Sequence, residues 1–133
     1  MKIIVFALIL VCSISIKINA QDCIGANVRE RKILKLINSL PEVVRENAYR
    51  RRTHAKALLQ AYIQNSPTKT NDYYSVSISE YSGQRLFTYD WYVVNPRTYV
   101  IRYWDIANTG RIMSLKEWRK RLYHQSKGKG QAY

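Results

Sequence analysis

Few side chains in this 133-residue chain could perform catalysis. A nucleophile needs a base within hydrogen-bond reach, and the chain has only two histidines, His54 and His124. One follows a run of arginines and the other lies near the C-terminus, so the sequence places neither beside a nucleophile. It also lacks a Gly-x-Ser-x-Gly motif, a glycine-rich phosphate loop and metal-ligand spacing. We therefore predict no enzyme activity, no cofactor and no metal site.

Two acids keep an alternative open. Asp90 and Asp105 lie in or at the end of aromatic, apolar runs, and two carboxyl groups on a sheet could perform acid–base catalysis. The simpler interpretation has Asp90 facing solvent or bonding a neighbouring tyrosine or Arg102, with Asp105 beginning a turn. An enzyme should show a concave pocket around one of these acids. A binding protein should show a flat or convex surface instead.

Basic residues outnumber acidic ones by 22 to 9, a net charge of +13. Such an excess attracts polyanions, including nucleic acid, lipopolysaccharide and acidic glycans. Because arginine forks bind phosphate and carboxylate groups, the candidate anion-binding residues are Arg50, Arg51, Arg52, Lys56 and Arg102. Alternatively, arginines at a helix end bond its last carbonyls, or the whole surface is a solvated cationic one. A purely polyanion-directed protein would bind less tightly as salt rises.

Aromatic side chains gather in one segment, with ten between residues 73 and 104. One face of the predicted sheet must pack on helices, and we predict that the other presents Tyr73, Tyr92 and Trp104. Such a face could stack on sugars, bases or a partner's side chains. The competing interpretation is that the aromatics pair across strands and stabilise the sheet.

The helices are predicted from caps and apolar spacing. Asn27 and Glu30 have the spacing of a capping box before a first helix, and Ser39 and Glu42 have the same spacing before a second, which runs to about Tyr49. Ser114 and Glu117 form a third such pair, before a short helix over residues 115–123.

Period-two alternation over residues 72–104 predicts an antiparallel meander. The predicted fold is therefore α+β, with a three- to four-stranded meander packed against two N-terminal helices and a short C-terminal helix. A single domain is expected over residues 21–125, followed by a disordered tail over residues 126–133.

The first twenty residues have the pattern of a signal peptide. Lys2 precedes an apolar run over residues 3–12, and Ala20 occupies the expected cleavage position. The run is shorter than the about 20 apolar residues that span a bilayer, so no transmembrane span is expected after cleavage. Losing two lysines with the leader would lower the net charge from +13 to +11. Cys23 alone would remain, which excludes an internal disulfide.

Four motifs occur in a recognisable order: Leu-Pro-Glu-Val at 40–43, Asp-Tyr-Tyr-Ser-Val at 72–76, Tyr-Trp-Asp at 103–105 and Ser-Leu-Lys-Glu-Trp-Arg at 114–119. In this the chain resembles a group of small exported proteins of Gram-negative bacteria, mostly described as uncharacterised. The resemblance implies an α+β fold and a strand near residues 58–63, but no activity. Propensity favours a helix over residues 56–63 and alternation favours a strand; with the resemblance, we predict a strand.

Together these features predict a small binding or interaction module, non-enzymatic and exported to the periplasm or beyond. Its ligand is unknown. The expected partner is an anionic envelope component or a protein, recognised through an aromatic and basic sheet face.

Overall fold

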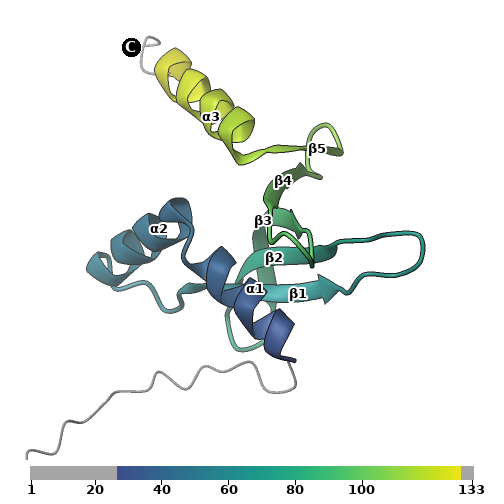
Figure 1. Cartoon of the computed structure of the whole chain (residues 1–133). Helices are drawn as coiled ribbons and strands as arrows, with labels where there is room; N and C mark the ends of the chain where they lie inside the picture. The colour runs from purple at the N-terminus through teal and green to yellow at the C-terminus, as the bar shows by residue number, and fades with distance from the viewer. Residues whose placement is uncertain (1–26, 130–133) are drawn as a thin grey trace, which may run out of the picture.

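The computed structural model describes residues 27–129; the predicted leader and Cys23 lie outside them. Three helices and five strands follow one another along the chain (Figure 1). They are α1 (Val28–Asn38), α2 (Pro41–Arg52), β1 (Leu59–Asn65), β2 (Tyr74–Tyr81), β3 (Leu86–Val94), β4 (Ile101–Asp105), β5 (Arg111–Ser114) and α3 (Leu115–Lys129). No helix within this range is long and apolar enough to cross a membrane.

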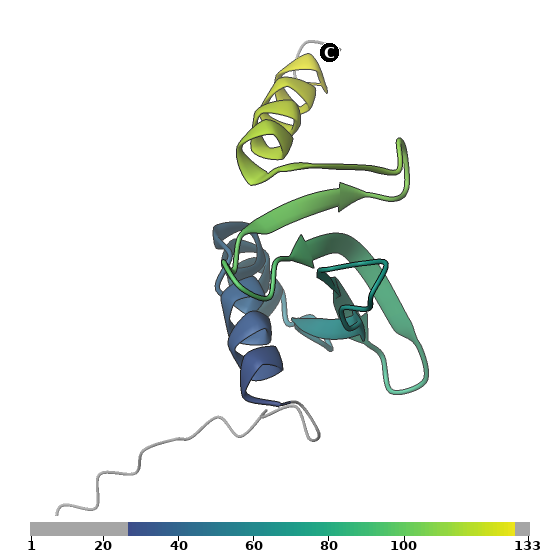
Figure 2. The same cartoon turned by 45° about the vertical axis from the view of Figure 1, so that its right-hand side comes forward.

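The strands form one antiparallel sheet in the order β1-β2-β3-β4-β5, which is a meander. Helices α1 and α2 pack at the β1 end, whereas α3 lies at the β4–β5 end (Figures 1 and 2). The α+β class and the antiparallel sheet are confirmed. The expected three to four strands are corrected to five, because the short strand β5 was interpreted as a loop and a helix cap.

Local capping explains where α1 begins and ends. The backbone N–H of Glu30 donates to the Asn27 side chain at 2.9 Å, and the Glu30 carboxylate accepts from the Asn27 N–H at 3.1 Å. The predicted Ser39–Glu42 box does not form. Ser39 instead caps the end of α1, where its hydroxyl donates to the Lys35 carbonyl at 2.7 Å. Helix α2 therefore begins with Leu40 as its N-cap and no side-chain cap.

Strand β1 confirms the strand prediction for residues 59–63, and two helical asparagines bond its outer edge. The Asn47 side chain accepts from the Leu59 N–H at 2.8 Å and donates to the Leu59 carbonyl at 2.9 Å. The Asn38 side chain accepts from the Ala61 N–H at 2.9 Å. These bonds attach α1 and α2 to the sheet and occupy edge groups that could otherwise pair with another chain.

The C-terminal helix is longer than predicted. It runs to Lys129, past residue 123, so residues 126–129 are helical and not part of a disordered tail; residues 130–133 lie outside the described part. Met113 and Trp118 are both buried in the main core and anchor the start of α3. Ser114 accepts from the Glu117 N–H at 3.1 Å, which supplies one bond of the predicted capping box.

Replacing Asn47 with alanine should destabilise the sheet edge. The Leu59 N–H and carbonyl would lose their partner, and leaving such groups unpaired costs about 1–3 kcal/mol. Urea unfolding should show a loss of this size for Asn47→Ala, and sedimentation should show more self-association. Asn65→Ala, which changes an exposed asparagine at the end of β1, is the control and should leave the stability and the self-association unchanged. Equal stability of the two variants would contradict the role assigned to Asn47.

Candidate functional site

Arg50 is part of the structure and not a free anion site. Its side chain is 12% exposed and bonds Glu46 at 3.1 Å and Glu80 at 2.7 Å. Tyr89 completes the group: its hydroxyl donates to Glu80 at 2.8 Å, and the guanidinium lies 5.1 Å from its ring centre. The hydrogen bond from Arg50 lowers the pKa of Glu80. Arg50 thus ties α2 to the sheet, which corrects its assignment as an anion-binding residue.

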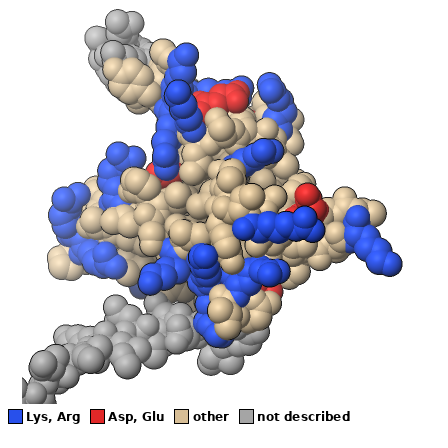
Figure 3. Space-filling view, in the orientation of Figure 1, with Lys and Arg blue, Asp and Glu red and all other residues tan. Residues whose placement is uncertain are grey.

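The remaining predicted anion-binding residues do not form one cluster. Arg51, Arg52 and Lys56 are exposed at the end of α2 and just after it, whereas Arg102 lies on β4. Lys and Arg side chains are spread over the whole visible face of the molecule (Figure 3). Arg50, Arg51 and Arg52 were grouped because they are consecutive in the sequence. On a helix they point in different directions, and Arg50 is bound to Glu46 and Glu80.

Tyr92 belongs to the core and not to an exposed aromatic face. It is 0% exposed and lies on the side of the sheet that packs on the helices. In the register of β3 and β4, Tyr92 is opposite Tyr103, and the Trp91 and Trp104 rings meet at 6.0 Å. Alternation within a strand does not decide which side is buried. Tyr92 and Trp104 consequently lie on opposite faces, and the prediction that grouped them is wrong.

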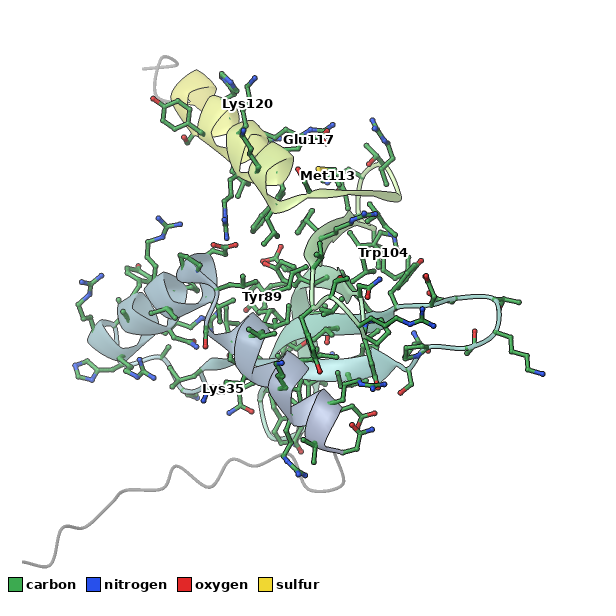
Figure 4. All side chains as sticks on the ribbon, viewed as in Figure 1. Lys35, Tyr89, Trp104, Met113, Glu117 and Lys120 are labelled. Carbon is green, nitrogen blue, oxygen red and sulfur yellow. The ribbon has the colours of Figure 1, made fainter. Side chains whose placement is uncertain are left out.

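The structure does bring Tyr73 and Arg102 together. Both line a cavity of about 380 Å³ on the sheet face away from the helices. We call it the outer groove, and it is lined by Asp72, Tyr73, Val93, Asn95, Thr98, Val100, Arg102 and Ile112. Trp104 lies opposite Ile112 in the register of β4 and β5, at the border of this groove. In Figure 4, Trp104 lies beside β4, whereas Tyr89 lies nearer to α2.

Arg102 is exposed, and no ion pair or hydrogen bond to its guanidinium is found among residues 27–129. Arg50, Arg119 and Arg121, by contrast, each contact a carboxylate. An unpaired guanidinium keeps its donors for a ligand. The groove therefore combines an unpaired guanidinium with apolar and aromatic walls, although Asp72 places one acid in its lining.

A second cavity, of about 430 Å³, lies between α2, α3 and the sheet. We call it the helix cleft. Its lining is Glu42, Val43, Arg45, Glu46, Leu59, Ile78, Tyr89, Asp90, Tyr103, Trp118 and Leu122. Asp90 was predicted either to face solvent or to bond a neighbouring tyrosine or Arg102; it is partly buried and accepts from the Tyr103 hydroxyl at 3.2 Å. The cleft also holds aromatic and acidic residues from three distant segments, which no local sequence pattern indicates.

Burial dominates the electrostatics of the helix cleft. It raises the pKa of the partly buried Asp90, although the Tyr103 bond opposes this. Burial and the charge of Asp90 raise the pKa of Tyr103 to about 12. The same two causes raise the pKa of Tyr92. Both tyrosines thus keep their protons at neutral pH.

Asp105 has a structural role at the β4–β5 turn. Its carboxylate accepts from Asn108 at 2.8 Å and from the Thr109 hydroxyl at 2.9 Å, and these bonds lower its pKa. Its carbonyl accepts from the Gly110 N–H at 2.6 Å, where Gly110 has a φ of +67° that a residue without Cβ adopts easily. These bonds agree with the expectation that Asp105 begins a turn.

Within residues 27–129, no three His, Cys, Asp or Glu side chains are grouped so that they could hold a metal ion. Comparison of the chain with known protein families, with curated proteins and with solved structures finds no match. The two cavities therefore have to be interpreted from their own chemistry.

Asp90 and Asp105 should respond to pH in opposite ways. The pKa of Asp90 is higher in the folded state than in the unfolded state, so its ionised form destabilises the fold. This loss of stability is complete at pH values above the folded-state pKa and is absent below the unfolded-state pKa of about 3.9. Asp90→Asn should therefore raise the free energy of unfolding at neutral pH, with a difference that shrinks on acidification. Asp105→Asn should lower it at neutral pH, because the stabilising ionised form is lost, and this cost should also vanish in acid. Urea unfolding across a pH series would check both signs, and the same sign for both variants would contradict the assignment.

Proposed function

We propose that this protein is an exported, non-enzymatic binding module whose outer groove recognises an anionic glycan of the cell envelope. The observation that carries the proposal is the meeting of Arg102 and Tyr73 in one cavity, with Trp104 at its border. These types of residue recognise acidic sugars, because a guanidinium binds the carboxylate and aromatic rings stack on the apolar faces of the sugar.

Charge supports an anionic ligand. The net charge, +13 for the whole chain and +11 once the predicted leader is removed, would draw a polyanion toward the surface from any direction. Long-range attraction of this kind does not select a site, so selection depends on Arg102, whose guanidinium is exposed and has no acidic partner within the described range. Among residues 27–129, no helix covers the side of the sheet that carries Arg102, which leaves room for an extended chain (Figure 2).

The alternative, a small enzyme, now depends on Asp90. The turn bonds of Asp105 occupy both of its carboxylate oxygens. Asp90 does lie in a concave cleft, which is the feature that an enzyme should show. Acid–base catalysis also needs a second group that can take up or release a proton near neutral pH, and the raised pKa values of Tyr92 and Tyr103 make them poor at this. We therefore favour binding over catalysis.

Removing the Arg102 guanidinium should weaken glycan binding about tenfold or more, since a charge-assisted hydrogen bond contributes about 1.5–3 kcal/mol. Calorimetric titration of a uronic-acid polysaccharide into wild type and Arg102→Ala would measure this. Arg85→Ala, which removes an exposed arginine from the β2–β3 turn, is the matched charge control. It should cause only the smaller loss that any lost charge causes.

The same titration separates the competing ligands. Equal losses for Arg102→Ala and Arg85→Ala would contradict a focused site and favour a purely polyanion-directed protein, with binding that falls steeply with salt. A larger loss for Arg51→Ala/Arg52→Ala would move the site to the end of α2. Tighter binding of single-stranded DNA or lipopolysaccharide than of the glycan would replace the proposed ligand, and no binding of any polyanion would redirect the search to protein partners.

Export is tested separately. Expressed in a Gram-negative host, the full chain should be recovered from the periplasm or medium with Gln21 as its first residue. Ala20→Arg should block this processing, because a small residue is required at the cleavage position. Mass spectrometry of the intact protein would check both. Recovery of the unprocessed chain from the cytoplasm would contradict the predicted leader.

A further inference from the structure

The helix cleft gathers acidic residues in a strongly basic protein. Three of the nine acids line it: Glu42, Glu46 and Asp90. Two of them are neutralised by arginine. Glu42 accepts two bonds from Arg119, at 2.9 and 3.1 Å, and Glu46 pairs with Arg50 at 3.1 Å. Asp90 has no basic partner among the described residues and receives only the Tyr103 hydroxyl, at 3.2 Å.

A second polar group near Asp90 has no hydrogen-bond partner in the described chain. Tyr92 is 0% exposed, and its hydroxyl is buried without a hydrogen-bond partner. That hydroxyl interacts electrostatically with Asp90, Glu42 and Tyr103, and all three line the cleft. A buried hydroxyl left unpaired normally costs stability. The cleft thus holds an unneutralised carboxylate, and the unsatisfied Tyr92 hydroxyl interacts with three of its lining residues although Tyr92 itself is not one of them.

The rest of the lining suits an alkyl stem. Val43, Leu59, Ile78 and Leu122 contribute aliphatic groups, and Trp118 contributes a ring that stacks on Tyr103 with centres 4.3 Å apart. Ring faces attract a cation in addition to their apolar contact. The volume of about 430 Å³ exceeds that of a single lysine side chain, so a ligand would share the cleft with water.

We propose that the helix cleft binds a primary ammonium group on an alkyl stem, with Asp90 as its counterion. The N–H donors of the ammonium can bond the Asp90 carboxylate and the Tyr103 hydroxyl oxygen, which both line the cleft, and water can accept from the remaining donor. A lysine side chain and a free alkylamine share this chemistry. The site is independent of the outer groove, which lies on the other side of the sheet.

Two arginines at the cleft have to be considered as competitors. Arg119 is held by its two bonds to Glu42. Arg45 lines the cleft and is exposed, and no bond from it to Asp90 is found. Its charge would repel an incoming cation, but water and salt screen exposed charges over about 8–10 Å. A compact ammonium can reach the carboxylate that neither guanidinium neutralises.

Titration of n-butylammonium into the wild-type protein tests the proposal by calorimetry. We expect saturable one-to-one binding that weakens about tenfold or more in Asp90→Asn, which keeps the shape and the acceptor oxygen but removes the charge. Glu117→Gln is the matched control, because it removes an exposed acid beside Trp118 that pairs only with Arg121. It should bind n-butylammonium like wild type.

Three results would overturn the proposal. The first is that the wild type does not bind n-butylammonium, and the second is that Asp90→Asn binds it as tightly as the wild type does. The third is that the wild type binds the neutral analogue n-butanol as tightly as n-butylammonium, which would make the cleft a general apolar site. If n-butylammonium binds as expected, a blocked lysine and cadaverine identify the source. Tighter binding of N-acetyl-lysine methylamide supports a protein partner's lysine, and tighter binding of cadaverine supports a free amine.

Discussion

Packing of Tyr92 and Tyr103 against Trp118 determines where both candidate sites lie. Tyr92 meets Tyr103 and Trp118 edge-on, with ring centres 5.7 and 6.0 Å apart, and this aromatic group joins α3 to the middle of the sheet. Because side chains alternate along a strand, burying these tyrosines on the helix side places Trp91, Arg102 and Trp104 on the other. The same packing forms a wall of the helix cleft and keeps α1, α2 and α3 away from the outer groove.

The distribution of charge partners distinguishes structural residues from free ones. Most acids in the helix cleft and beside it accept from an arginine: Glu42 from Arg119, and Glu46 and Glu80 from Arg50. These pairs join α2 to the sheet and to α3. Asp90 lines the helix cleft and Arg102 lines the outer groove, and neither has an ionic partner in the described chain. Polar groups that the fold does not use are the ones that remain for ligands.

The sheet face that carries the outer groove contains buried polar residues, although α1, α2 and α3 do not cover it. Ser75, Ser77 and Ser79 on β2 are almost inaccessible, and Ser77 lies between the larger side chains Tyr62 and Trp91 in the strand register. The Ser79 hydroxyl donates to Ser77 and contacts Thr88, each at 3.0 Å. Small hydroxyl residues on the central part of the face let the flanking aromatics close over them. This face can therefore be both well packed and open to a ligand.

The sequence by itself determined the features that depend on neighbouring residues. The Asn27–Glu30 cap, the apolar stripe of α1, the alternating strands of the meander and the turn at Asp105 all follow from local spacing, and these give the α+β class. Tertiary contacts decided the rest. Asn47 and Asn38 stabilise β1 as an edge strand, Glu80 binds Arg50 across thirty residues, and the cross-strand register separates Tyr92 from Trp104. Alternation marks two faces of a strand but does not say which one is buried, because that depends on where the helices pack.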